Sequence, residues 1–92
     1  MKANYLVCYD IRDERRLQRV YNQAKKVGIH LQYSVFYCRL TWPELLEFKR
    51  TLNDIIDESK DDVRFYPLPE NPKVTVMGLG DRIPDGIMVF LR

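Results

Sequence analysis

The most constraining feature of this sequence is an unbroken apolar and aromatic run near its start, Tyr5–Tyr9. Successive side chains of a strand point to opposite faces of the sheet, so a strand with one wet face alternates between apolar and polar residues. Here both alternate sets are apolar, which predicts that both faces of the strand are covered. Residues 4–11 are therefore expected to form a central strand.

Two segments have the pattern of amphipathic helices. The first lies between a candidate N-cap at Asp13 and a candidate stop at Gly28. Its expected buried residues are Leu17, Val20, Tyr21, Ala24 and Val27. Thr41 and Glu44 form a capping box with a proline in the first turn, which predicts the start of the second helix. The polar run 57–62 is expected to end it, after a buried stripe of Leu45, Phe48, Leu52, Ile55 and Ile56.

The remaining segments are rich in β-forming residues. Residues 29–40 predict either one long strand or two short strands around a bend near Ser34, because periodicity does not distinguish the two. Residues 63–68 predict another strand, and 73–80 and 86–91 predict two more. In the strand 63–68 we expect one face to carry Val63, Phe65 and Leu68.

This order of elements predicts an α+β fold. The natural topology is a ferredoxin-like βαββαβ core with an extra C-terminal strand and both helices on one face of an antiparallel sheet. We expect residues 1–92 to form one domain, and a homodimer to cover the apolar side chains on the other face. No secretory signal or bilayer-length apolar run is present. We therefore expect a cytoplasmic protein, without membrane contact, with Cys38 reduced and Cys8 reduced in the core.

Charge is unevenly spread along the chain. Residues 1–50 hold ten Lys and Arg against five Asp and Glu, a net of +5, whereas residues 51–92 hold five against eight, a net of −3. A basic half on a nearly neutral protein indicates either a local anionic partner such as nucleic acid or a solvated basic helix face.

Asp10 is the first candidate functional residue. A carboxylate at the end of a covered strand is costly unless it is paired, hydrogen-bonded or bound to a metal. Asp10 either reaches solvent and pairs with Arg12 or Arg16, or it belongs to a hard-cation site. Mg²⁺ typically binds one or two carboxylates together with waters and phosphates. A twofold axis near the strand would bring two copies of Asp10 together, as a catalytic and metal site for phosphodiester cleavage.

Arginines follow Asp10 closely. Arg12, Arg16 and Arg19 are spaced i, i+4 and i+7, which would place them on one stripe of the first helix. Arg15 lies beside that stripe. Guanidinium groups suit bidentate phosphate contacts, and a helix N-terminus favours anions. These four residues are predicted to bind nucleic-acid phosphates; the alternative is salt bridges to the acidic residues 13–14 and solvation.

The segment 33–36 supplies the third candidate. Ser34 could hydrogen-bond a phosphate, and Phe36 could pack against a partner or a base. A serine nucleophile needs a base within reach, and His30 is the only histidine. We expect His30 to be a partly exposed strand residue rather than a catalytic base.

Three motifs occur in a specific order across nearly the whole chain: a strand ending in YDI, then GIHLQYSVFYCRLT, then DDVRFYPL. With these motifs the chain resembles the small CRISPR-associated endoribonuclease family, the second of the two universal CRISPR adaptation proteins.

The resemblance implies a ferredoxin-like homodimer with sheets packed face to face and a C-terminal strand that reaches the partner chain. It implies that Asp10 is a metal-binding aspartate near the dimer axis, and that the chain bends near Ser34 between two short strands. It also implies Mg²⁺-dependent cleavage of single-stranded RNA or double-stranded DNA, and a scaffold role with the CRISPR integrase. His30 departs from the Arg or Lys of several members. The matching motif positions are Tyr9, Asp10, Arg19, Ser34 and Phe36.

The function is then a spacer-acquisition protein of the metal-dependent endonuclease type. The alternative hypotheses are a non-catalytic DNA-binding scaffold, and a ferredoxin-like ribonuclease toxin or small-ligand regulatory domain. Genomic context tests the last of these, because a neighbouring integrase gene and repeat array argue against it.

Overall fold

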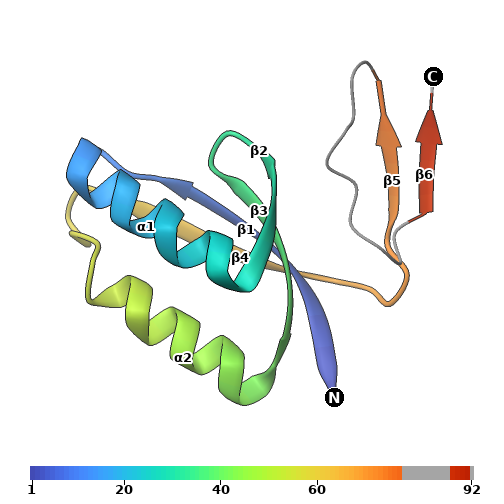
Figure 1. The fold of residues 1–92 in the computed structure, drawn as a ribbon, viewed down its shortest axis with the longest axis horizontal. Helices are drawn as coiled ribbons and strands as arrows, with labels where there is room; N and C mark the ends of the chain where they lie inside the picture. Colours follow the sequence, from blue (N-terminus) through green and yellow to red (C-terminus); the bar gives the residue numbers. More distant parts are fainter. Residues whose placement is uncertain (78–87, 92) are drawn as a thin grey trace.

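The computed structural model describes residues 1–77 and 88–91 (Figure 1). Its elements are β1 (Lys2–Asp10), α1 (Glu14–Val27), β2 (Gly28–Gln32), β3 (Val35–Thr41), α2 (Trp42–Asn53), β4 (Asp62–Leu68), β5 (Lys73–Val76) and β6 (Met88–Leu91). The first four strands form a sheet in the order β2-β3-β1-β4, with every neighbouring pair antiparallel. This arrangement confirms the α+β, ferredoxin-like βαββαβ core.

Strand β1 is central, as predicted, and lies between β3 and β4. It begins two residues earlier than expected, at Lys2, and ends at Asp10 rather than at residue 11. Val7 is fully buried and Tyr9 is 7% exposed, because both face the helices and join the main core. Cys8 points to the other face and is only half-buried, so its predicted place in the core is wrong.

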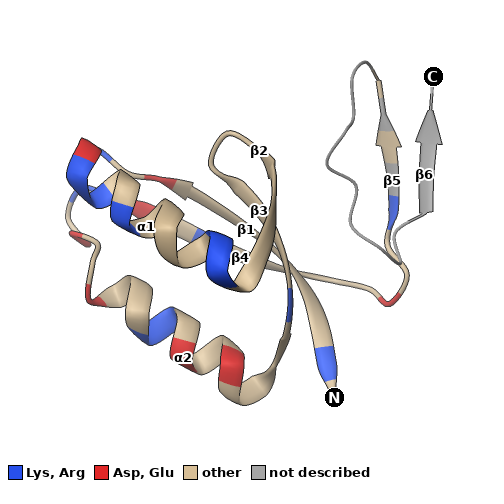
Figure 2. Ribbon diagram, viewed as in Figure 1, with Lys and Arg blue, Asp and Glu red and all other residues tan. Residues whose placement is uncertain are grey.

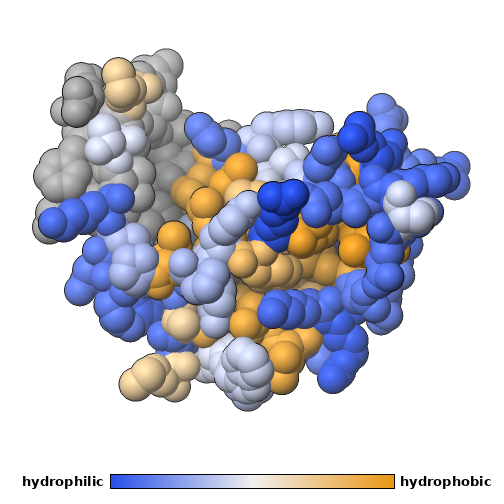
Figure 3. Space-filling model, turned by 180° about the vertical axis from the view of Figure 1, so that it is seen from behind, coloured by the Kyte–Doolittle hydropathy of each residue, from blue (hydrophilic) through white to orange (hydrophobic). Residues whose placement is uncertain are grey.

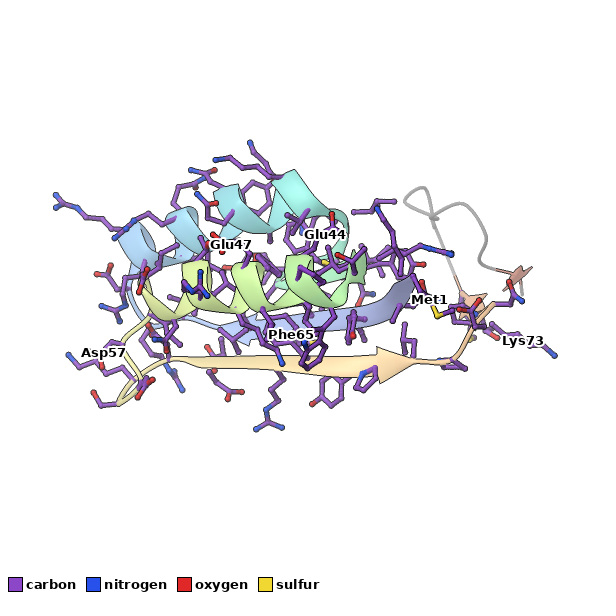
Figure 4. The ribbon with its side chains drawn as sticks, turned by 90° about the horizontal axis from the view of Figure 1, so that it is seen from below. Met1, Glu44, Glu47, Asp57, Phe65 and Lys73 are labelled. Carbon is purple, nitrogen blue, oxygen red and sulfur yellow. The ribbon has the colours of Figure 1, made fainter. Side chains whose placement is uncertain are left out.

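Both helices cover one face of the sheet, and no helix of the described residues covers the other (Figure 4). Each helix begins at its predicted cap. The Asp13 side chain accepts a hydrogen bond from the backbone of Arg16, and both hydrogen bonds of the Thr41–Glu44 capping box are present. Phe48 of α2 packs edge-on against Phe65 of β4, with ring centroids 5.8 Å apart.

Two predicted helix details are wrong. Val27, the last residue of α1, is 37% exposed, because the chain turns directly into β2. Helix α2 ends at Asn53, before the polar run 57–62, so Ile55 and Ile56 lie beyond it. Both still contribute to the core, since Ile55 is 8% exposed and Ile56 packs against the buried cluster.

The β2–β3 hairpin depends on close backbone packing at its start and on a tight reversal at its tip. Gly28 stands so close to β3 that a Cβ would lie 2.5 Å from the Cys38 sulfur and 2.7 Å from the Tyr37 carbonyl oxygen. Ser34 has φ of 62°, a left-handed conformation that reverses the chain between the two strands. The predicted bend near Ser34, with two short strands around it, is therefore confirmed.

The second face of the sheet, here called the open face, carries one apolar row across all four strands. Register places Ile29, Tyr37, Leu6 and Tyr66 side by side in that row. Figure 3 shows apolar surface across the middle of this side of the molecule, with hydrophilic surface around it. Leu68 also belongs to the open face, because it pairs with Asn4; the prediction that it shares a face with Val63 and Phe65 is wrong.

The C-terminal part forms two short strands. Strands β5 and β6 pair in parallel and make a separate two-stranded sheet beside the core (Figure 1). They match parts of the predicted segments 73–80 and 86–91; residues 78–87 lie outside the described residues. Neither described helix has the length and hydropathy of a membrane-spanning segment.

Candidate functional site

Asp10 is the last residue of β1 and lies at the edge of the open face. Its side chain is 65% exposed, and one carboxylate oxygen lies 3.6 Å from the Arg12 guanidinium. Asp10 thus reaches solvent and pairs with Arg12, one of the two partners considered from the sequence. An exposed pair of this kind contributes little to stability, so the carboxylate is available to a ligand.

A second carboxylate lies directly beside Asp10. Register pairs Asp10 with Asp62, the first residue of β4, and places the two side chains on the same face. Asp62 is 55% exposed and accepts a 2.8 Å hydrogen bond from Arg64. Sequence reasoning missed Asp62. The register was needed to find it: only if the strand that begins near residue 62 is an antiparallel neighbour of β1 does its start meet Asp10.

Asp61, one residue earlier, has a structural role instead. Its side chain is fully buried, and four N–H groups converge on its two oxygens. The Arg16 guanidinium donates two hydrogen bonds, at 2.7 and 3.1 Å, and the backbone N–H groups of Arg12 and Asp57 donate the others, at 2.9 and 2.8 Å. The Arg16 hydrogen bond is the main reason that the pKa of Asp61 lies well below its usual range.

The Arg16–Asp61 contact changes the expected arginine stripe. The Arg16 guanidinium is engaged within the chain, by an acidic residue 45 positions away rather than by residues 13–14. Arg12 precedes the helix, since α1 begins at Glu14, so the three predicted residues do not share one helical stripe. Arg15 and Arg19 are exposed and form no ion pair with a described residue. Figure 2 shows basic residues at the start and in the last turn of α1.

The three supporting residues lie on the helix side of the sheet or at its edge. Phe36 is fully buried and stacks with Tyr9 at 6.3 Å between ring centroids, so it cannot contact a partner or a base. The Ser34 carbonyl accepts the backbone N–H of Tyr9 at 3.1 Å. His30 is half-buried, as predicted, with its ring 4.8 Å from that of Phe36. No hydrogen bond joins Ser34 and His30 within the described residues.

A pocket of about 310 Å³ opens where α1 passes the β2–β3 turn. Its lining residues come from β1, α1, β2 and the turn: Tyr9, Leu17, Gln18, Tyr21, His30, Tyr33 and Ser34. The sequence did not indicate this pocket, because its residues are scattered over 26 positions with no motif spacing.

A metal site would need ligands beyond those that one chain brings together here. Across residues 1–77 and 88–91, no three His, Cys, Asp or Glu side chains lie close enough together to hold a metal ion. The donors that do meet, Asp10 and Asp62, are exposed carboxylates, which are the ligand type that Mg²⁺ prefers. They therefore fit half of a hard-cation site.

Known proteins resemble this chain in sequence and in fold. The family model described as CRISPR associated protein Cas2 matches residues 3–76. The CRISPR-associated endoribonuclease Cas2 2 of Thermodesulfovibrio yellowstonii is 59% identical over 90 residues, which cover 98% of this chain and 99% of that protein. The crystal structure of a hypothetical protein from Thermus thermophilus is 34% identical with a TM-score of 0.79, over 87% of this chain and 95% of that one. A chain of a partial Cas6-RT-Cas1–Cas2 complex is 27% identical with a TM-score of 0.66, over 75% of each chain.

Proposed function

Because the chain belongs to the Cas2 family of CRISPR-associated proteins, we propose that it acts in CRISPR adaptation as a nucleic-acid-binding endonuclease, centred on Asp10. The observation that carries the proposal is the pairing of Asp10 with Asp62 at matched positions of adjacent strands. Both carboxylates are more than half exposed, and each has an arginine beside it. Carboxylates next to guanidinium groups suit a site where a phosphodiester is held and attacked.

The carboxylates of Asp10 and Asp62 are the residues that would hold Mg²⁺. When bound, such an ion polarises a phosphate oxygen and lowers the pKa of a bound water. The residues of the chain supply the rest. Arg12 and Arg64 lie beside the two carboxylates and would neutralise the phosphate, and the buried Asp61 fixes the backbone of Arg12 next to Asp10. The relatives named endoribonuclease support RNA as the substrate.

A second copy of the chain on the open face would complete this site. The row from Ile29 to Tyr66 leaves apolar side chains partly exposed, with Ile29 at 43% and Tyr66 at 44%. A twofold dimer buries the same patch on both subunits and brings a second Asp10 toward the first. Tyr66→Arg is expected to convert a dimer to monomers in sedimentation velocity. Trp42→Arg, at an aromatic residue 64% exposed on α2, is the matched control and should leave the dimer intact.

The cleavage test uses Asp10→Ala, which should abolish Mg²⁺-dependent cutting of single-stranded RNA and duplex DNA with the melting temperature unchanged. Glu47→Ala is the matched control, because Glu47 is an equally exposed carboxylate on α2, on the helix side of the sheet (Figure 4). Cleavage that persists in Asp10→Ala, or that needs no divalent ion, contradicts the nuclease proposal.

A non-catalytic scaffold is the second candidate function, favoured by the exposed side chains of Arg15 and Arg19. The complex named for Cas1 and Cas2 supports the Cas1 integrase as partner. The double variant Arg15→Glu, Arg19→Glu should weaken duplex binding. The slope of log K against log salt concentration should also become shallower, by about 0.9 for each phosphate that the protein no longer neutralises. Lys49→Glu on α2 is the control. Spacer integration that fails in the arginine variant but persists in Asp10→Ala identifies the scaffold as the working role.

A further inference from the structure

The pocket between α1 and the β2–β3 turn plays no part in the site at Asp10. Tyr9 and Asp10 are consecutive residues of β1, so their side chains point to opposite faces of the sheet. Tyr9 faces the helices and lines the pocket, whereas Asp10 lies on the open face. A dimer through the open face therefore leaves the pocket uncovered.

Aromatic rings form the walls of the pocket, and the core holds them in place. The Tyr21 ring meets His30 edge-on at 5.4 Å, and His30 stacks on the buried Phe36. Tyr33 stands on the rim with 81% of its surface exposed, at the tip of the hairpin. A tyrosine so exposed adds little to the core, but its free ring is a stacking surface beside a preformed pocket.

Polar groups of both hydrogen-bonding types are free within the pocket. The Tyr9 hydroxyl forms no hydrogen bond with another described residue. It is nevertheless not a buried atom without a partner, since the described residues contain none, so it must be accessible from the pocket that Tyr9 lines. A tyrosine hydroxyl is protonated at neutral pH and can donate; burial raises the pKa of Tyr9 further, to about 12. Gln18 donates to Asn22 at 3.0 Å, which orients its amide and leaves its carbonyl oxygen to accept.

Cations lie on the helix beside the entrance. The Lys25 ammonium lies 5.4 Å from the centre of the ring of Tyr21, a lining residue, and Arg15 is exposed on α1 one turn before Gln18. A planar ligand with hydrogen-bonding edges and an attached anion matches this set of walls, free polar groups and cations. Unstacked nucleobases of single strands have that chemistry, whereas the bases of a duplex are already stacked and paired.

We infer that this pocket binds one unstacked nucleobase of a single-stranded nucleic acid, with Tyr33 as the stacking residue. The inference rests on the proposed nucleic-acid function and specifies its substrate as one with an unpaired base. Arg15 and Lys25 hold the phosphates that flank the bound base.

The test measures binding of a single-stranded oligonucleotide that carries one 2-aminopurine, without divalent ions so that the strand is not cut. Emission of the probe should fall when the wild-type protein binds, because the base stacks on an aromatic ring. Tyr33→Ala should weaken single-strand binding about 10-fold, the usual effect of losing one stacking residue, and abolish the change in emission. Tyr33→Phe should stay within about twofold of the wild type, because it keeps the ring.

Two controls separate this inference from the proposed function. Trp42→Ala removes another exposed aromatic, on α2, and should leave single-strand binding unchanged. Binding of an unmodified duplex of equal length should be the same in all variants. If Tyr33→Ala binds the single strand as tightly as the wild type does, and duplex binding persists, the base-binding pocket is refuted but the proposed function is not. Failure to bind either nucleic acid overturns the proposed function as well. If Tyr33→Ala changes the oligomeric state in sedimentation velocity, the pocket is a contact between two copies of the chain, and the inference is also refuted.

Discussion

Replacing Tyr37 by phenylalanine should destabilise the protein, because the side-chain oxygen of Asn4 loses its hydrogen-bond donor. The Tyr37 hydroxyl donates a 2.6 Å hydrogen bond to the side-chain oxygen of Asn4, and the Asn4 amide nitrogen donates to the Pro69 carbonyl at 3.3 Å. Asn4 is 4% exposed and Tyr37 is 5% exposed. Tyr37→Phe keeps the ring but leaves the Asn4 oxygen buried without a donor.

The expected cost follows from that orphaned oxygen. A buried acceptor that loses its partner costs about 1–3 kcal/mol, and we expect about 2 kcal/mol because water has almost no access to Asn4. For a domain of this size, each kcal/mol lowers the melting temperature by about 4–8 °C, so the expected fall is about 8–16 °C. Calorimetry and urea unfolding at one fixed protein concentration measure both quantities, since dimerisation would make them depend on concentration.

Two further variants separate the orphaned oxygen from a general loss of packing. Tyr33→Phe removes a hydroxyl from a tyrosine that is 81% exposed, and its stability should stay within about 0.5 kcal/mol of the wild type. Asn4→Leu combined with Tyr37→Phe removes both polar partners and should recover at least half of the loss. The reasoning is refuted if Tyr37→Phe is as stable as the wild type. It is also refuted if the double variant loses more unfolding free energy than the two single variants lose together.

Three other outcomes follow from the structure. Asp61→Asn places an amide NH₂ against converging N–H donors and should lower the melting temperature far more than Asp62→Asn, its exposed neighbour. Folding lowers the pKa of Asp61, so the ionised carboxylate stabilises the folded protein fully above about pH 4, and this contribution is lost as the pH falls toward the folded-state pKa. The difference in unfolding free energy between wild type and Asp61→Asn should therefore narrow in that acid range. Thr41→Ala removes the cap of α2 and should cost about 1 kcal/mol in urea unfolding. Gly28→Ala drives a methyl group into the β3 backbone and should reduce thermal stability, whereas an unchanged melting curve would contradict the close approach.

The parts of the fold that could be predicted from the sequence depend on local chemistry. Asp13 and Thr41 define the helix starts, because a cap needs only the residues that follow it within one turn. The uninterrupted apolar run in β1 predicted a central strand, and β1 does lie between β3 and β4. The bend at Ser34 was decided by the family resemblance and not by local periodicity, and the left-handed backbone there appears only in the structure.

The parts that sequence reasoning missed depend on contacts between distant residues. Arg16 was expected to face a ligand, but Asp61 binds it across 45 positions. Asp62 lies beside Asp10 only through the β1–β4 register, which no local pattern contains. Phe36 has the same sequence character as an exposed aromatic, and only the packing of α1 on the sheet buries it.

Consecutive side chains of β1 point to opposite faces of the sheet, and this separates the pocket from the carboxylates. The pocket beside Tyr9 and the carboxylate of Asp10 lie on opposite sides of one sheet, although the two residues share a peptide bond. A nucleic acid that used both would have to pass around the end of the sheet near Arg12, while separate molecules could occupy the two sides at once. Substitutions around the pocket can therefore occur without disturbing the carboxylates on the other side. Strand β1 thus separates the two proposed sites, so that each can change independently of the other.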